Sequence, residues 1–285
     1  MMGVLFPRPA WIGLGVSVAG HSRRIIVSGH NTSRAASPQY PVARKSITPR
    51  NLPAARSVNY PQGEPKSGKE IQGDTMSKAK AILYDATLCT GCKQCEKAHA
   101  QKYDVFYDEE IAAEDYQSAH KVTMIQEVDG KFMRKLCLHC DDPLCSCPMG
   151  GYAKLEEGPM VYRGGCVHCG NCVLRCVFNQ SFLDYGSSPF SVKKCQMCPD
   201  LVTKGLAPAC ATACPTGATK FGDRDALLAE AKERIRQNPD KYVNHIYGET
   251  EAGGCSVMLL SSIPFEKFGW PTKEDLDRKM CSLRK

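Results

Sequence analysis

Between positions 166 and 176 the chain reads CVHCGNCVLRC, with cysteines at Cys166, Cys169, Cys172 and Cys176. Three cysteines separated by two residues each can reach three irons of one cubane cluster, while the backbone N–H groups of so short a loop point at its sulfides. The fourth cysteine follows three residues later, where a helix is expected to start, and is directed at a second cluster. The segment therefore predicts a small fold built around paired [4Fe-4S] clusters.

Three other cysteine blocks repeat this pattern. We number the blocks in chain order, so that the segment above is block III. The candidate ligands outside it are Cys89, Cys92, Cys95 and His99 in block I, Cys137, Cys140, Cys145 and Cys147 in block II, and Cys195, Cys198, Cys210 and Cys214 in block IV. Four comparable blocks in one chain indicate an internal repeat and predict several clusters.

The 17 cysteines of the chain admit two other interpretations. Disulfide frameworks use even numbers of spread cysteines in short extracellular chains, whereas here 15 cysteines lie in tight groups between Cys89 and Cys214. Zinc suits block IV taken alone, because a CxxC with a distant cysteine pair is common in zinc sites. The triplets of blocks I and III offer one thiolate too many per loop for zinc. Iron–sulfur ligation is therefore favoured. Cys255 and Cys281 stand apart from the groups and are expected to be a buried thiol and a surface thiol, respectively.

The formal charge of +7 comes from the N-terminal extension, where no Asp or Glu precedes Glu64. The rest of the chain is close to neutral, which does not indicate the basic, aromatic-bearing face of a nucleic-acid binder. Residues 1–75 are expected to be disordered, or to be a wrongly extended start with Met76 as the true first residue. A signal h-region at 10–19, a twin-arginine signal at Arg23-Arg24 and an organelle transit peptide are the alternatives.

Downstream of Met76 the pattern predicts short strands, turns and cysteine loops. The expected strands are 81–84, 121–126, 160–162 and 219–222. A helix is expected over 223–237, capped by Asp223 or Asp225, with Leu227, Leu228, Ala231 and Ile235 on one face. We therefore expect an extension at 1–75, a double ferredoxin-like domain at 76–222, and a C-terminal helix and partner-docking tail at 223–285. No stretch of about 18 apolar residues occurs, which predicts no membrane span.

The tail carries five aromatic residues: Tyr242, Tyr247, Phe265, Phe268 and Trp270. The simpler interpretation is that they pack the tail onto the body of the protein. The alternative is that some of them form a docking surface for a partner subunit. The chain contains no recognisable nucleophile–base pair, paired catalytic carboxylates or phosphate-binding glycine loop, so it is predicted to be non-catalytic by itself.

The four blocks, with Cys-Pro-Thr-Gly-Ala at 214–218, resemble the four-cluster ferredoxin-type subunits of molybdopterin or tungstopterin oxidoreductases. Within that family the iron–sulfur (beta) subunit of formate dehydrogenase is most similar, on segments 81–85, 222–225, 245–249, 253–261 and 264–267. The resemblance covers about residues 78 to 271. It implies an α+β fold of two ferredoxin-like modules with a helical or irregular tail, and four [4Fe-4S] clusters, or three if one site is lost. Because metal ligation replaces apolar burial in small modules, the metal-free chain is expected to be largely unfolded.

The resemblance also implies how the blocks share clusters. Blocks I and IV form one module, and blocks II and III form the other. The implied ligand sets are Cys89, Cys92, Cys95 and Cys214; Cys195, Cys198, Cys210 and residue 99; Cys137, Cys140, Cys145 and Cys176; and Cys166, Cys169, Cys172 and Cys147.

Two positions depart from the family pattern. His99 stands where the family has cysteine, and our hypothesis is that its neutral imidazole ligates iron, making that cluster less negative and raising its potential. The alternative is a cluster with three protein ligands and His99 merely nearby. Cys145 and Cys147 are separated by one residue where the family has three, so the backbone is expected to adjust there. His139 and His168 occupy spacer positions in CxHC turns and are expected to be neighbours of clusters or surface groups, not ligands.

The implied function is a relay of single electrons between a catalytic subunit with a Mo/W-pterin, formate dehydrogenase-like, and a cytochrome, a quinone-linked membrane subunit or a soluble carrier. The alternatives are the electron-transfer subunit of a hydrogenase or sulfur-compound reductase, a free-standing polyferredoxin, or a zinc-dependent interaction protein. Lys93 and Arg175 adjoin the blocks and either raise a cluster potential or are simply solvated. The default compartment is the cytoplasm, with export alongside a signal-bearing partner to the periplasm as the alternative.

Overall fold

The computed structural model describes residues 79–114, 116–186 and 191–284. The predictions for residues 1–75 lie outside the described residues. The helices are α1 (Gln94–Tyr103), α2 (Glu109–Glu114), α3 (Asn171–Leu174), α4 (Pro199–Val202), α5 (Ala209–Thr212), α6 (Arg224–Gln237) and α7 (Lys273–Arg284), with short 3-10 turns η2 (Glu251–Gly253) and η3 (Phe265–Phe268). The strands are β1 (Lys80–Asp85), β2 (Met124–Val128), β3 (Lys131–Lys135), β4 (Tyr152–Lys154), β5 (Met160–Tyr162), β6 (Phe182–Asp184), β7 (Ser191–Lys193), β8 (Thr219–Asp223) and β9 (Val257–Leu260).

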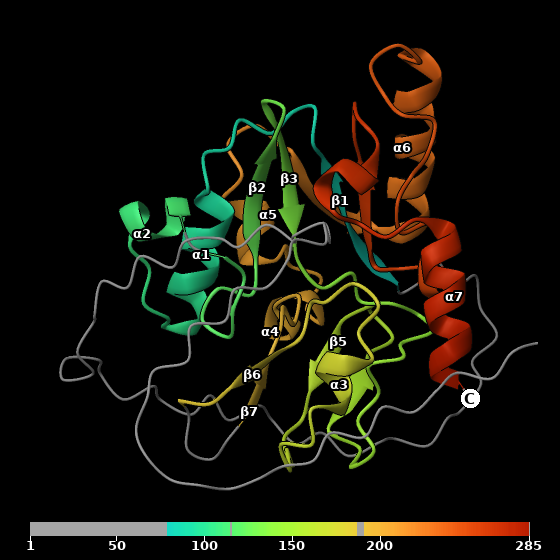
Figure 1. Cartoon of the computed structure of the whole chain (residues 1–285). Coiled ribbons are helices and arrows are strands. Elements are labelled where there is room, and N and C mark those ends of the chain that lie inside the picture. Colours follow the sequence, from blue (N-terminus) through green and yellow to red (C-terminus); the bar gives the residue numbers. More distant parts are fainter. Residues whose placement is uncertain (1–78, 115, 187–190, 285) are drawn as a thin grey trace, which may run out of the picture. The chain divides into compact units, whose positions relative to one another are not determined.

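A three-stranded sheet of order β8-β1-β9 joins three segments that are far apart in the chain (Figure 1). β1 pairs with β8 in antiparallel orientation, with Lys80 opposite Asp223. It pairs with β9 in parallel orientation, with Ile82 opposite Val257. The sheet thus ties the segment before block I to the segment after block IV and to the tail.

The two faces of β1 contribute to different cores, because successive side chains of a strand point to opposite faces. Ala81 and Leu83 pack with α6 in a cluster of buried apolar residues that includes no cysteine among the described residues. Ile82 and Tyr84 belong to a second cluster that contains cysteines from all four blocks. We call these clusters the α6-side core and the thiol-side core.

Helix α6 lies where the sequence predicts a helix, and its buried residues Leu227, Ala231 and Ile235 lie on the predicted face. The prediction that Asp223 caps it is wrong in one respect. Asp223 occupies the N-cap position with an extended backbone, but its side chain makes no capping hydrogen bond. Its carboxylate instead pairs with Lys80 across the sheet, because β1 and β8 bring the two side chains opposite each other.

Three two-stranded hairpins, β2–β3, β4–β5 and β6–β7, make up the rest of the strand structure. The predicted strand 160–162 is confirmed as β5. The strand predicted from residue 121 begins only at Met124. Lys121 is buried there outside the strand, because its ammonium group bonds the Ala112 carbonyl at 2.8 Å and lies 3.4 Å from the Glu96 carboxylate.

The tail is more regular than the sequence predicts. It supplies β9, all four residues of which are buried, and the terminal helix α7. All five of its aromatic residues, listed above, are buried. Tyr247 and Trp270 stack with ring centroids 5.6 Å apart, and the Tyr247 hydroxyl donates to the Pro271 carbonyl at 2.9 Å. These contacts support the packing interpretation for the aromatic residues and not a docking surface made of them.

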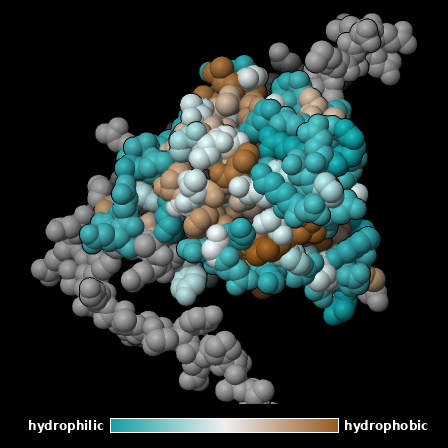
Figure 2. Space-filling model, turned by 90° about the horizontal axis from the view of Figure 1, so that it is seen from above, coloured by the Kyte–Doolittle hydropathy of each residue, from teal (hydrophilic) through white to brown (hydrophobic). Residues whose placement is uncertain are grey.

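The surface seen from above in Figure 2 is hydrophilic at both flanks, and white to brown, more hydrophobic side chains gather between them. Across residues 79–284, apart from the two gaps, no helix combines the length and apolar character needed to cross a membrane.

Candidate metal centres

The first two cysteines of each block are connected by a turn of the same kind. The residue before the second cysteine has a left-handed backbone in all four blocks, with φ of 72° at Gly91, 54° at His139, 59° at His168 and 61° at Met197. Three of these four residues are not glycine, and a left-handed non-glycine residue costs of order 1–3 kcal/mol. The repeated geometry is what allows successive N–H groups to turn toward one centre.

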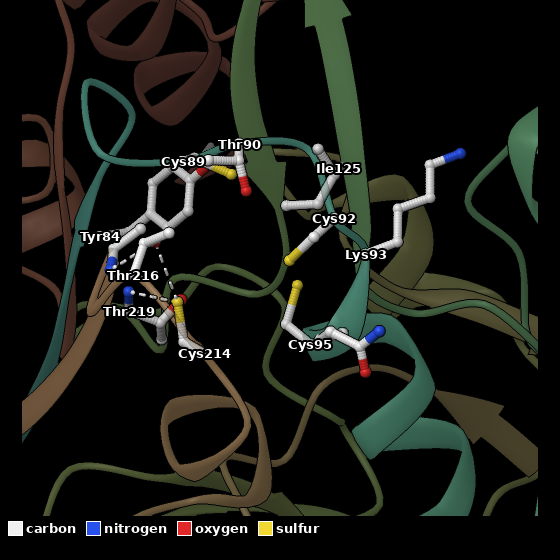
Figure 3. A pocket seen from close by; sticks show the side chains of 12 residues that line it. Tyr84, Cys89, Thr90, Cys92, Lys93, Cys95, Ile125, Cys214, Thr216 and Thr219 are labelled. Atoms are coloured by element: carbon white, nitrogen blue, oxygen red, sulfur yellow. Dashed lines mark hydrogen bonds between the residues drawn. The ribbon is translucent and has the colours of Figure 1, made fainter.

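A first cavity is lined by Cys89, Cys92, Cys95 and Cys214, and we call it the first cradle. Figure 3 shows that the sulfurs of Cys92 and Cys95 point toward one another, with Cys214 facing them from the other side. The Tyr84 side chain closes the cavity next to Cys89, and its hydroxyl is fixed by the Phe132 carbonyl at 2.9 Å. The fold thus brings one cysteine of block IV to the triplet of block I, as the resemblance implies.

A second cavity is lined by Cys147, Cys166, Cys169 and Cys172, and we call it the second cradle. Tyr152 of β4 and Tyr162 of β5 form part of its wall. Cys147 reaches this cavity although only one residue separates it from Cys145. The chain passes very close to itself behind Cys147, since a Cβ atom on Gly151 would lie 2.8 Å from the Gly164 carbonyl oxygen and 3.2 Å from the Cys147 sulfur. Glycine at position 151 therefore makes room for the shortened block.

Backbone N–H groups donate to cysteine sulfurs at both cradles. Gly91 donates to Cys89 at 3.4 Å and Thr219 to Cys214 at 3.4 Å in the first cradle. In the second, His168 donates to Cys166 at 3.4 Å. Hydrogen bonds to the sulfurs are among the features that set the reduction potential of an iron–sulfur centre.

A third group of thiols, the block II group, lies in the protein interior. It consists of Cys137, Cys140, Cys145 and Cys176, whose neighbouring charges perturb one another. Burial is the largest effect and raises the pKa of Cys176 to about 11. Cys145 thus lies next to the thiols of this group, whereas Cys147 lines the second cradle, despite the single residue between them.

The fourth group, the block IV group, contains Cys195, Cys198 and Cys210. Burial raises the pKa of Cys195 to about 12, with Cys210 as the next contribution. His99 lies on α1, and its ring packs on Tyr103 in a tilted arrangement, with centroids 4.8 Å apart. The Tyr103 side chain in turn lies close enough to Cys198 to act on the pKa of its thiol, which burial raises. Burial, assisted by the Arg134 charge, lowers the pKa of His99 to about 4, so the imidazole is neutral near this group.

The two cysteines outside the blocks lie as the sequence predicts: Cys281 is exposed and Cys255 is fully buried. Cys255 lies opposite Cys140 in an isolated antiparallel bridge. The structure also buries two cations next to cysteines, Arg134 and Lys194. The Lys194 ammonium group lies 3.6 Å from the Cys137 sulfur and donates to the Cys195 carbonyl at 3.1 Å. A single Arg or Lys in a sequence gives no sign of whether its side chain is buried. The burial of these two cations could therefore not be predicted from the sequence.

His139 and His168 lie in the turns of blocks II and III. The His139 side chain is fully buried, and its Nδ1 accepts from the Met160 N–H at 2.8 Å. The His168 ring packs on Tyr185 with centroids 5.2 Å apart. Both rings are thus held by protein contacts next to the thiols.

The donor set fits iron–sulfur clusters. Thiols line the walls of two cavities from several sides, and left-handed turns present N–H groups to the sulfurs. Within the described ranges no three His, Cys, Asp or Glu side chains converge as they would around one metal ion.

Residues 128–224 match the family described as a 4Fe-4S dicluster domain. This match covers blocks II, III and IV, and it identifies the chain as a ferredoxin-type iron–sulfur protein.

Three relatives extend the comparison. The nitrate-inducible formate dehydrogenase iron-sulfur subunit of Escherichia coli K12 is 32% identical over 199 residues, which are 63% of this chain and 67% of that protein. The hydrogenase-2 operon protein HybA of Escherichia coli O157:H7 is 29% identical over 241 residues, 68% of this chain and 74% of that protein. A protein of Nitratidesulfovibrio vulgaris is 34% identical over 209 residues, which cover 66% of this chain but only 55% of that protein.

The chain belongs to the family of formate dehydrogenase-type iron–sulfur subunits, which are electron-transfer subunits.

Proposed function

We propose that the chain relays single electrons through four [4Fe-4S] clusters between a catalytic subunit and a downstream acceptor. The observation that carries this proposal is the division of 15 cysteines and His99 into four groups, each next to a turn of the same left-handed geometry. Bound clusters would supply the one-electron redox chemistry. The chain performs no bond chemistry in this proposal; its thiolates hold the irons and its N–H groups donate to the sulfurs.

The proposed ligand sets follow the four groups. The first cradle supplies Cys89, Cys92, Cys95 and Cys214, and the second supplies Cys147, Cys166, Cys169 and Cys172. The block II group supplies Cys137, Cys140, Cys145 and Cys176, and the block IV group supplies Cys195, Cys198, Cys210 and His99. In this arrangement blocks I and IV form one module and blocks II and III the other.

Iron and acid-labile sulfide per chain, measured after anaerobic purification, test this assignment. About 16 iron and 16 sulfide per chain are expected for four filled sites. About 12 iron would mean that one site is absent, and zinc in place of iron would overturn the proposal. A His99→Ala variant tests the imidazole as a ligand. Its spectrum should differ from that of the parent in one cluster, and an identical spectrum would exclude His99 from the ligand set.

The proposed catalytic partner carries a Mo- or W-pterin and oxidises formate. The support is the similarity to a formate dehydrogenase iron–sulfur subunit. A hydrogenase is the second candidate, because the similarity to HybA covers a longer segment. The outlet proposed for either is a cytochrome, a quinone-linked membrane subunit or a soluble carrier.

The two partners can be distinguished in the complex isolated anaerobically from cells that produce the full chain. Formate should bleach the brown colour of a complex that contains molybdenum or tungsten. Hydrogen gas should bleach one that contains nickel. A response to neither donor, from a chain that contains iron and is free of other subunits, would favour a free-standing polyferredoxin.

Exposed apolar side chains are the surface feature that bears on a role as a subunit. Large apolar side chains among the described residues are more than half exposed at seven positions: Phe106, Tyr116, Met149, Val167, Leu174, Tyr185 and Leu206. A contiguous patch of such side chains is typical of a protein–protein contact site, whereas single ones are ordinary on a protein surface. Val167 lies within the loop of the second cradle and lines its cavity. The tail aromatics give no such support, because they are buried.

A further inference from the structure

Arg134 is a buried cation on β3. Only 1% of its surface is exposed. Its Nε donates to the Thr123 hydroxyl at 3.1 Å, while its Nη1 has no hydrogen-bond partner in the part of the chain that the structure describes. No carboxylate of the described residues lies within ion-pair distance of it. Burial of an unpaired charge is very unfavourable, so a negative group is expected at the free end of the guanidinium.

The groups that surround the guanidinium are thiols. Cys210, Cys95 and Cys195 are the three whose charges act on Arg134 most strongly. Cys95 belongs to the first cradle, whereas Cys195 and Cys210 belong to the block IV group. Arg134 is therefore adjacent to two of the four candidate cluster sites at once, and it lies on a hairpin that belongs to none of the blocks.

We propose that Arg134 is an electrostatic residue shared by two iron–sulfur cluster sites, the first cradle and the block IV group, and that its charge stabilises the reduced state of both. This inference rests on the proposed function, because it requires clusters at these sites. Each one-electron reduction adds one negative charge to a cluster. A fixed positive charge nearby favours that state, and net charge and hydrogen bonds to the sulfurs are the levers that set cluster potentials.

The burial of Arg134 makes this effect larger than that of a surface cation. The interaction of two charges depends inversely on the effective dielectric constant, which is about 80 in water and about 20 near protein groups. Arginine stays protonated at every accessible pH, so its charge does not vary. Because thiols of both sites act on the guanidinium, its charge should raise the potentials of both neighbouring clusters.

Lys131 offers a matched control. It lies on the same strand as Arg134, β3, but its side chain is exposed. A Lys131→Gln variant removes one positive charge from a solvated position on this strand. Because solvent screens this charge, the reduced-to-oxidised ratio of any cluster at fixed potential should change by less than about threefold.

The test uses the full chain with its clusters. Iron and acid-labile sulfide are counted for the parent, Arg134→Gln and Arg134→Lys, and a potentiometric titration followed by electron paramagnetic resonance gives the cluster potentials. In Arg134→Gln, two of the clusters should be reduced only at a lower potential than in the parent. Their reduced-to-oxidised ratio at fixed potential should fall about tenfold, which is 59 mV for a one-electron couple. Arg134→Lys keeps the charge and should retain most of the parent potential.

Each result decides the proposal. Unchanged potentials in a fully loaded Arg134→Gln variant, or a shift confined to one cluster, would overturn it. If Arg134→Gln loses iron while Arg134→Lys loads fully, the charge compensates the clusters and the proposal stands. If both variants lose iron equally, Arg134 acts only through packing and the proposal fails. A parent chain without iron would instead refute the proposed function, and is recognised by the metal analysis of the parent alone.

Discussion

The two faces of the sheet β8-β1-β9 support cores of different chemistry. The α6-side core contains Leu83 and Leu227 among its buried residues and no cysteine within the described part of the chain. The thiol-side core contains Ile82, Tyr84 and cysteines of every block. The first is an apolar core with no thiol among its described residues. The second presents thiols where apolar side chains would otherwise pack, so its stability depends on what those thiols bind.

The regions also differ in the length of their elements. α6 has 14 residues and packs on strands of 4 to 6 residues. Around the second cradle the strands have three residues each, and α3 has four. Elements this short are marginal without a partner. Metal–ligand bonds therefore contribute more to the second region than to the first, by the same logic that makes small metal-binding domains unfold when the metal is removed.

Removal of iron should have the largest effect on this contrast. We expect a chelator, added under reducing conditions, to abolish hydrogen-exchange protection in the β4–β5 and β6–β7 hairpins. Protection should persist in β1, β9 and α6, because their apolar contacts do not involve cysteine. Hydrogen exchange followed by mass spectrometry measures both regions in one sample. A uniform loss of protection would mean that the sheet has no independent stability, as the sequence alone suggested for the metal-free chain.

Truncation of neighbouring residues on β1 should separate the two cores. Leu83→Ala and Ile82→Ala each create a cavity that destabilises the protein by about 2–5 kcal/mol. Leu83 faces the α6-side core, so its variant should keep the parent iron content. Ile82 faces the thiol-side core, and its variant should lose iron as well as stability. Thermal midpoints and iron per chain, measured side by side, check this pair, and equal iron loss in both variants would contradict a division between the faces.

The ion pair of Asp85 should give a smaller change. Its buried carboxylate accepts from the Arg234 guanidinium at 2.7 Å and from the Tyr242 hydroxyl at 2.8 Å. Breaking a buried pair costs about 3–5 kcal/mol, but Arg234 is partly exposed and keeps its second partner, Glu230, at 2.6 Å. Asp85→Asn should therefore destabilise the α6 side by about 2 kcal/mol.

The exposed pair between Lys232 and Glu249 provides the control for that change, since it joins α6 to the tail at 2.6 Å in solvent. Lys232→Gln should alter stability by no more than about 0.5 kcal/mol. Iron content should stay at the parent value in both variants. A loss of iron from Asp85→Asn would show that the region before block I positions Cys89 as well as stabilising the sheet.

The sequence predicted those parts of the molecule that depend on local pattern. The spacing of Leu227, Ala231 and Ile235 places them on the buried face of α6, and the cysteine intervals alone predict the turns at His139 and His168. The expected grouping of Cys214 with block I and of Cys147 with block III also agrees with the two cavities.

The rest depends on contacts between distant segments, which a single sequence does not encode in readable form. β9 pairs with β1 across more than 170 residues, so residues 257–260 could not be distinguished from an irregular tail. Asp223 matches the pattern of a helix cap, yet the sheet offers it the Lys80 ammonium group. Arg134 is one of three basic residues of β3, and only the fold shows that it is buried beside thiols of two blocks.

The pH dependence of the tail should be the smallest effect. The His245 ring lies 2.8 Å from the Glu251 carboxylate, and hydrogen bonding to Glu251 raises the pKa of His245. Glu266 and Glu249 act on it in the same direction. Burial opposes ionisation of Glu251, but the bonds from His245 and the backbone lower the pKa of that carboxyl.

The sign of the effect follows from both shifts. A raised histidine pKa stabilises the fold fully below the unfolded value of about 6.5, and this contribution is lost as the pH rises through the folded pKa. The lowered pKa of Glu251 stabilises the fold above about 4.5 and is lost as the pH falls. The pair therefore contributes most between about pH 4.5 and 6.5.

Since 44% of the His245 side chain is exposed, solvent screening limits this contribution to about 1 kcal/mol or less. His245→Gln keeps a polar side chain next to Glu251 but cannot be protonated. The variant should lie below the parent in thermal midpoint at pH 6 and approach it at pH 8.5. His245 packs on Phe265 of the thiol-side core, with ring centroids 5.5 Å apart, so a variant that is destabilised equally at both pH values would show that the ring acts through packing and not through its charge.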